Sequence, residues 1–221
     1  MRETALSAEH VRHSPQWIVV HGMRIPGRFA AEGDPRDLAL ADLSCFVRTG
    51  LKGRNAARWL VQRGVQVPPR ANTWTPHGSG GLVARLGETE FLIEDGLAPG
   101  SARDFALQLE DASDNVYPVL RQDTAIALTG NRVNEVLRQT CSVDFASIDT
   151  AGALVMTSMI GVPVLVIPQT HDGFPLVRIW TDPTFGPYLW RTLLQIVQEL
   201  GGGPAGLSQF YPEHQHQGES A

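Results

Sequence analysis

The pattern of apolar and polar residues predicts helices and strands in alternation along the chain. Apolar residues recur at helical spacing of three and four in 55–64, 101–111, 131–141 and 187–200. Short runs rich in β-branched residues lie between these segments and indicate strands. They predict one hairpin in 82–95, a second hairpin that turns near Gly161, and a further strand in 174–180. The pattern therefore predicts an α+β protein.

Two stretches align when their glycines are matched, which indicates an internal duplication. They are residues 46–60, "FVRTGLKGRNAARWL", and residues 123–137, "DTAIALTGNRVNEVL". The alignment matches Leu51 with Leu128, Gly53 with Gly130, and Leu60 with Leu137. Strand, glycine, helix, hairpin and second helix follow in the same order in both regions. We expect two interlocked α+β units, neither of which needs to fold alone.

The duplication sets the expected domain boundaries. One duplicated domain is predicted over residues 39–203, with repeats at about 40–115 and 116–203. Residues 1–38 are expected to form a leader and a first strand, and residues 204–221 a polar C-terminal tail.

Gly130 has two interpretations. A glycine that opens a helix can let the helix N-terminus hold a phosphate. It can also permit a close approach of strand and helix that a Cβ atom would obstruct. The second interpretation is favoured because Gly53 occupies the same joint in the other repeat. Both glycines are therefore predicted to be structural.

Composition and charge exclude some classes of function. Of the 221 residues, 43% are hydrophobic and 19% are charged, and the formal net charge is -5. These values suit a globular protein and leave no basic field for a nucleic-acid backbone. The longest apolar run is interrupted by polar residues, Gly161 and Pro163, so no membrane span is expected. The first residues lack the apolar core of a secretory signal, which favours a cytoplasmic location.

Several residues could carry chemistry, and each has a simpler explanation. Ser44, His21 and Asp42 are a nominal hydrolase triad, but no nucleophile motif accompanies them. His214 and His216 could bind zinc, although a polar tail does not fix the ligand geometry. The glycine-rich segment 77–81 lacks the lysine of a nucleotide cradle. We therefore predict no catalytic, cofactor-binding or metal-binding residue in this chain.

Aromatic residues gather in the segment 180–190, "WTDPTFGPYLW". Tryptophan and tyrosine are enriched at protein interfaces as well as in cores. The segment connects a predicted strand to the last helix, and connections run over the surface. We expect a partner interface formed by Trp180, Phe185, Tyr188 and Trp190.

Three longer segments resemble one family, the gamma subunit of heterotetrameric sarcosine oxidase. They are "ALADLSCFVRTGLKGRNAARWL", "RQDTAIALTGNRVNEVLRQTCSVDF" and "RIWTDPTFGPYLWRTLLQIVQELGGG". That family belongs to the fold group of folate-binding aminomethyltransferases. In true aminomethyltransferases a leucine-arginine-leucine-glutamate segment shapes the folate pocket, and this chain lacks that segment. The lysine-glycine-cysteine-tyrosine segment of related folate-dependent proteins is also absent. No catalytic residue is carried over by the resemblance.

The resemblance implies a role as well as a fold. It implies a non-catalytic small subunit in a flavin-dependent complex that oxidatively demethylates sarcosine or a related N-methyl amine. FAD, FMN and NAD are expected on the larger alpha and beta subunits, and tetrahydrofolate can belong to the same complex. The alternative is a stand-alone tetrahydrofolate-binding protein of one-carbon metabolism, with or without aminomethyl transfer.

Overall fold

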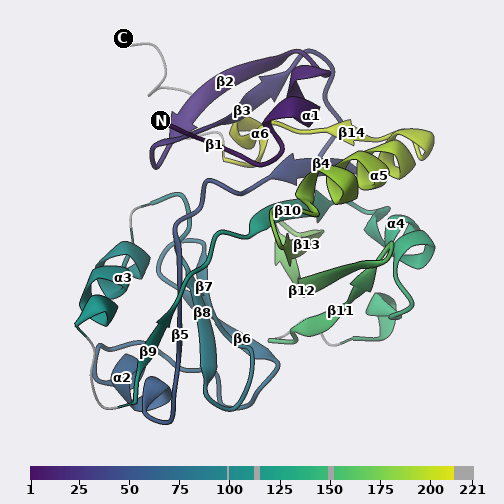
Figure 1. Cartoon of the computed structure of the whole chain (residues 1–221). Coiled ribbons are helices and arrows are strands. Elements are labelled where there is room, and N and C mark those ends of the chain that lie inside the picture. Colours follow the sequence, from purple (N-terminus) through teal and green to yellow (C-terminus); the bar gives the residue numbers. More distant parts are fainter. Residues whose placement is uncertain (99, 112–114, 149–151, 212–221) are drawn as a thin grey trace. The chain divides into compact units, whose positions relative to one another are not determined.

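The computed structural model describes all residues except 99, 112–114, 149–151 and 212–221 (Figure 1). The chain forms two compact units, each of which is described by itself. Unit 1 comprises Met1–Cys45, Asp123–Thr150 and Met156–Ala221, and unit 2 comprises Phe46–Gln122 and Ala151–Val155.

Unit 2 is a five-stranded sheet with two helices on one face. The strand order is β6-β7-β8-β5-β9, and all neighbouring strands are antiparallel. The elements are β5 (Arg48–Lys52), α2 (Ala56–Val61), β6 (Thr73–His77), β7 (Gly81–Arg85), β8 (Glu90–Glu94), α3 (Ala102–Glu110) and β9 (Tyr117–Val119). Leu51, Val83, Phe91 and Ile93 of the strands pack with Trp59 and Phe105 of the helices to form the core. Alternate strand positions supply this face, as the pleat of a strand requires.

Unit 1 contains a larger sheet of six strands in the order β11-β12-β13-β10-β4-β14. Its elements are β4 (Ala39–Asp42), β10 (Thr124–Thr129), α4 (Val133–Thr140), the 3-10 turn η1 (Phe145–Ser147), β11 (Val155–Met159), β12 (Val162–His171), β13 (Phe174–Thr181), α5 (Gly186–Glu199) and β14 (Gly203–Pro204). The short β14 runs parallel to β4. Pro187 lies in the first turn of α5, where its missing N–H costs no helix hydrogen bond.

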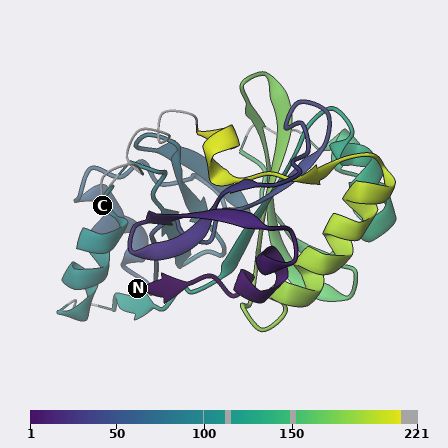
Figure 2. The same cartoon turned by 90° about the horizontal axis from the view of Figure 1, so that it is seen from above.

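Described segments on both sides of the predicted duplicated domain form helices and strands, whereas residues 212–221 of the predicted polar tail lie outside the described residues. β1 (Arg2–Glu3), β2 (Pro15–Val20) and β3 (Met23–Phe29) form a three-stranded sheet in unit 1. α1 (Ser7–Val11) lies beside α5 in both views (Figures 1 and 2). In the predicted tail, α6 (Leu207–Phe210) packs on β3 and buries Leu207 and Phe210. Side chains such as Leu6, with 0% exposure, hold these segments by apolar burial.

The predicted duplication is confirmed. Each repeat follows the order strand, helix, three strands, helix: β5-α2-β6-β7-β8-α3 in unit 2 and β10-α4-β11-β12-β13-α5 in unit 1. The meander of three strands replaces the single hairpin that the sequence pattern suggested. The interlocking comes from exchanged strands. β4 precedes the first repeat but pairs with β10, and β9 precedes the second repeat but pairs with β5.

Gly53 and Gly130 sit at the same joint in the two repeats, and both are constrained by the exchanged chain. Their φ angles are +132° and +113°. A Cβ atom on Gly53 would lie 2.0 Å from the carbonyl oxygen of Asn115, just before β9. A Cβ atom on Gly130 would lie 2.2 Å from the carbonyl oxygen of Asp37, just before β4. The close neighbour of each glycine is the incoming exchanged chain, which leaves no room for a Cβ atom, and the structural role of both glycines stays a prediction.

Candidate functional site

The N–H groups at the Gly130 joint are occupied by main-chain carbonyl groups. Gly130 N donates to Pro175 O over 3.0 Å, and Arg132 N donates to Asp37 O over 3.1 Å. At the matching joint, Gly53 N donates to Thr89 O over 3.0 Å. A phosphate site needs such N–H groups to be free for the anion. The joint therefore works as a strand connector, and the phosphate interpretation is wrong.

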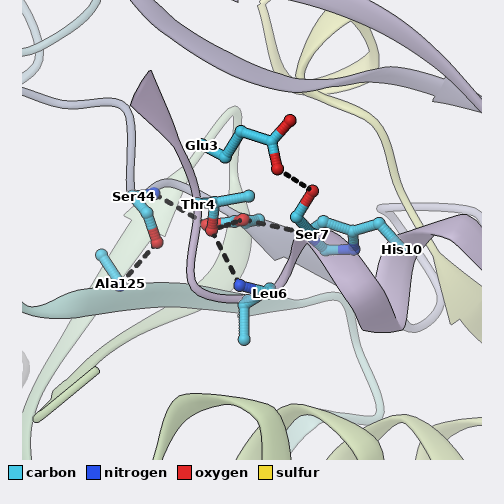
Figure 3. Close-up of polar contacts among 8 residues, drawn as sticks. Glu3, Thr4, Leu6, Ser7, His10, Ser44 and Ala125 are labelled. Carbon is cyan, nitrogen blue, oxygen red and sulfur yellow. Dashed lines mark hydrogen bonds and ion pairs between the residues drawn. The ribbon is translucent and has the colours of Figure 1, made fainter. Parts of the chain in front are cut away.

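Unit 1 contains a buried cluster of polar side chains, and Figure 3 shows how its labelled members converge. The Asp42 carboxylate at the end of β4 is its centre. Asp42 Oδ2 accepts hydrogen bonds from Thr4 Oγ1 at 2.7 Å and from His10 Nε2 at 2.9 Å. Asp42 Oδ1 accepts from Ser44 N at 2.8 Å. Ser44 Oγ in turn accepts from Ala125 N at 3.1 Å.

The surroundings of Asp42 keep it ionised. Burial acts to raise the pKa of the Asp42 carboxyl, but the hydrogen bonds from His10, Ser44 and Thr4 and the charge of His10 outweigh burial and lower that pKa. An ionised carboxylate accepts hydrogen bonds only, so Nε2 of His10 carries the proton in this contact.

His10 is enclosed by aromatic rings. Its side chain has 0% exposure, and its ring centroid lies 6.2, 5.7 and 4.7 Å from those of Trp17, Phe29 and Trp190. The other ring nitrogen, Nδ1, has no hydrogen-bond partner among the described residues. A shielded imidazole of this kind cannot exchange protons with a substrate in solution. The cluster therefore ties the N-terminal segment to β4.

The nominal triad is corrected by this geometry. Asp42 and Ser44 do meet, but the histidine of the cluster is His10. His21 lies in the turn between β2 and β3, with φ of 48°. Ser44 contacts the carboxylate through its backbone N–H, and its hydroxyl oxygen accepts from Ala125. This arrangement lacks the serine–histidine contact that activates a nucleophile.

Sequence reasoning missed His10, and one signal could have found it. Helical spacing in 5–11 places Leu6 and His10 on one face, and both side chains are fully buried. The Asp42 partner lies 32 residues away in sequence, which no local pattern reveals.

An ion pair joins the same segment to α5. Arg191 donates to Glu9 at 2.6 and 3.2 Å, and Arg12 donates to Glu9 at 3.0 Å. The hydrogen bond from Arg191 is the main cause that lowers the pKa of Glu9, against the effect of burial. The pair helps to place α1 on α5.

The predicted interface residues divide into two classes. Trp180 and Trp190 are 2% and 0% exposed, so the expectation that they face a partner is wrong. Trp190 instead packs against His10, which the sequence pattern did not connect to it. Phe185 and Tyr188 are 44% and 49% exposed, and their contact with a partner stays a prediction.

Other sequence candidates are placed as follows. Segment 77–81 forms the turn between β6 and β7. Asp182 Oδ1 accepts from Thr184 N and Oγ1, so Asp182 stabilises the turn that leads into α5. His214 and His216 lie outside the described residues. Within the described part of the chain, no group of three or more metal-ligating side chains converges, and no helix is long and apolar enough to span a membrane.

Unit 1 also holds a shallow pocket of about 320 Å³, which His13 and Glu32 help to line. Glu32 Oε1 accepts from Phe29 N at 2.9 Å and from Gly206 N at 2.8 Å. Burial is the largest of the causes that lower the pKa of His13. Glu32 thus joins β3 to the start of α6, which is a structural task for this carboxylate.

Comparison with solved structures identifies the architecture. The glycine cleavage system aminomethyltransferase T from Bartonella henselae superimposes with a TM-score of 0.73 at 13% identity over 95% of this chain. The fold is that of the folate-binding aminomethyltransferases. This chain spans 60% of the length of that enzyme.

A heterotetrameric sarcosine oxidase from Corynebacterium sp. U-96, solved in complex with pyrrole 2-carboxylate, also contains the fold. One of its chains matches with a TM-score of 0.62 at 21% identity, over 78% of this chain and 89% of that one. No protein-family model and no curated protein sequence matches this chain. At identities this low, the structural matches establish the fold, and the activity has to be tested separately.

Proposed function

We propose that this chain is a non-catalytic small subunit of a flavin-dependent, sarcosine-oxidase-like complex. The observation that carries the proposal is the difference in coverage between the two structural matches. The chain covers 60% of the aminomethyltransferase but 89% of the sarcosine oxidase chain. The match therefore extends over most of one chain of a heterotetramer and over a smaller share of aminomethyltransferase T.

The three segments that resemble the gamma subunit support the same role. They include β4, β5 and α2, then β10 and α4, and finally β13 and α5. They cover the first strand and helix of both repeats, the exchanged strand β4, and the end of β13 with the closing helix α5. In the proposed complex the larger alpha and beta chains carry FAD, FMN and NAD, and sarcosine or a related N-methyl amine is the substrate.

The exposed rings of Phe185 and Tyr188 favour a partner contact. They are 44% and 49% exposed, Phe185 as the N-cap residue and Tyr188 in the first turn of α5. Aromatic side chains commonly anchor protein interfaces because they bury a large area with few rotatable bonds.

Co-expression tests the proposal. The chain is co-expressed with sarcosine-oxidase-type alpha and beta chains encoded in the same genome, and the tagged chain is purified. We expect a stable complex with flavin absorbance and sarcosine oxidation. The alpha and beta chains purified without this chain are the control, and we expect them to be less stable. If the wild-type chain forms no complex with any of these alpha and beta chains, the proposal is contradicted.

Tetrahydrofolate binding is the second candidate, favoured by the match that covers 95% of this chain with aminomethyltransferase T. The absence of the pocket-forming segment argues for weak or no binding by the isolated chain, because a pteridine needs several converging hydrogen-bonding groups. Calorimetric titration with tetrahydrofolate decides between the two. A dissociation constant in the micromolar range or tighter would favour this candidate over the subunit role.

A further inference from the structure

The two sheets differ at one edge. In unit 1 the sheet continues past the exchanged strand β4 to β14. In unit 2 the order of the described strands stops at the exchanged strand β9. An edge strand presents unpaired backbone groups to which another strand can bind.

β4 and β9 occupy the same position in the two repeats. Counting from the matched glycines Gly53 and Gly130, Gly50 of β5 corresponds to Ala127 of β10. Gly50 pairs with Val119 of β9, and Ala127 pairs with Ala41 of β4. Val119 therefore corresponds to Ala41, and by the same count Pro118 corresponds to Leu40.

In unit 1 the outer edge of β4 is filled through its carbonyl groups. Ala205 N donates to Leu40 O at 2.8 Å, and Gly203 N donates to Leu38 O at 3.4 Å. The corresponding carbonyl groups at the edge of unit 2 belong to Pro118 and Val116.

The pairing of β9 with β5 indicates the direction of these groups. Pro118 lies opposite Leu51 in the antiparallel pair. In an antiparallel ladder, hydrogen-bonded pairs, which exchange two hydrogen bonds, alternate with non-hydrogen-bonded pairs. Proline has no N–H, so Pro118 and Leu51 form a pair of the second kind, in which the backbone N–H and C=O groups of each residue point away from the partner strand. The Pro118 carbonyl therefore points to the open edge.

The side chains around this edge are apolar and exposed. Tyr117 is 54% exposed, Leu120 is 80% exposed, and Leu107 on the adjacent helix α3 is 60% exposed. The residues of unit 1 that correspond to Tyr117 and Leu120 are Ala39 and Asp42, which are 0% and 4% exposed. Unit 1 covers with its own segments the positions that the described residues of unit 2 leave exposed.

We propose that the edge of β9 binds an extended segment of a flavin-bearing partner chain, which adds a strand to the sheet of unit 2. This inference rests on the proposed subunit function and names the surface that serves it. The incoming strand donates N–H groups to the carbonyl oxygens of Val116 and Pro118, as Gly203 and Ala205 do to those of Leu38 and Leu40. Its apolar side chains cover Tyr117, Leu120 and Leu107.

Pro118 selects a partner chain over a second copy of this protein. When two β9 edges pair with each other, each offers an acceptor at Pro118 and neither offers a donor there. A different strand with free N–H groups meets both acceptors. Proline on an edge strand is a known device against self-association.

The test is assembly of the complex with charged edge variants. Leu120→Lys and Tyr117→Lys are compared with Val61→Lys, which changes a side chain of unit 2 that is 60% exposed on α2. Each variant is co-expressed with the alpha and beta chains, and the dissociation constant of the complex is measured. We expect each edge variant to weaken assembly by at least about tenfold and the control to change it by less than about twofold. Circular dichroism and thermal unfolding of each variant alone should match the wild type.

The outcomes distinguish failure of the proposed binding edge from failure of the proposed subunit function. If wild-type chain assembles and both edge variants assemble equally well, the edge proposal is overturned and the subunit function stands. If wild-type chain forms no complex, both fail. Hydrogen exchange of Leu120 N–H supplies a second reading, with protection expected only in the complex. Protection of this N–H in the isolated chain would overturn the proposal. The molecular mass in solution would then show whether a second copy of the protein or a segment of the same chain covers the edge.

Discussion

The two repeats of this chain follow the same path, yet they are completed differently. Both run from strand to helix, through three antiparallel strands, to a second helix, and both admit an exchanged strand at a glycine joint. Unit 1 then adds β1, β2, β3, α1, β14 and α6, whereas unit 2 adds no described element beyond the repeat and its exchanged strand. The comparison shows how one α+β plan can support two kinds of surface.

Matched positions show what the additions change. Asp42, the centre of the buried cluster, corresponds to Leu120, which is 80% exposed. Trp190 is the fifth residue of α5, and Ala106 is the fifth residue of α3. Trp190 packs on His10 of the added segment. Large or charged residues are buried in unit 1 where an added segment supplies a partner.

Trp190→Ala should have the largest effect. It removes a side chain with 0% exposure that packs on His10. We expect the free energy of unfolding to fall by about 3–5 kcal/mol, as for other buried aromatic residues. Phe185→Ala, at 44% exposure, is the control and should change it by less than about 1 kcal/mol. Urea unfolding measures both. Equal small losses would mean that α1 and α5 do not share a core.

Asp42→Ala tests how much the polar cluster stabilises the fold, in comparison with the matched position Leu120 in unit 2. The change leaves Thr4, His10 and Ser44 N without their buried acceptor. We expect a loss of about 3 kcal/mol, because removal of one member leaves buried polar groups unpaired. Leu120→Ala is the matched change in unit 2 and should alter stability by no more than about 0.5 kcal/mol. A small loss for Asp42→Ala, measured by urea unfolding, would show that the cluster contributes little.

Gly53→Val and Gly130→Val test the equivalence of the two joints. Each variant should lose roughly 1–3 kcal/mol through its φ angle and its clash with the incoming strand. Gly64→Val is the control, because Gly64 has φ of +75° but no heavy atom within 4 Å of the position that a Cβ atom would take. It should lose less, since it reports backbone strain alone. Unchanged thermal stability in the two joint variants would refute the structural role.

The pH dependence should show the smallest difference. The folded pKa of Asp42 lies below the ordinary value of 3.8, so the ionised carboxylate stabilises the fold above that pH. This contribution is lost as the pH falls through the folded pKa. The stability difference between wild type and Asp42→Asn should therefore shrink as the pH is lowered below 3.8. Leu120→Ala should keep the wild-type profile. A difference that does not depend on pH would mean that Asp42 is not ionised in the native state.

Much of the fold could be predicted because its signals are local. The glycine joints, the helix that follows each, and the hairpin in 82–95 depend on residues close together in sequence. Phe185 and Tyr188 are exposed, in keeping with their place in a connection, and their contact with a partner stays a prediction. Trp180 and Trp190 were misplaced, since burial depends on which distant segment covers a residue.

The sequence by itself determined the duplication, the strand-glycine-helix order that opens each repeat, and the matched positions of Gly53 and Gly130. These follow from periodicity and from backbone geometry within a few residues. Only the tertiary structure decided that β4 and β9 are exchanged, that His10 meets Asp42, and that β9 is the last of the described strands at its edge of the sheet. Each of these depends on contacts between segments far apart in the chain, where hydrogen bonding and burial choose among partners that no local pattern distinguishes.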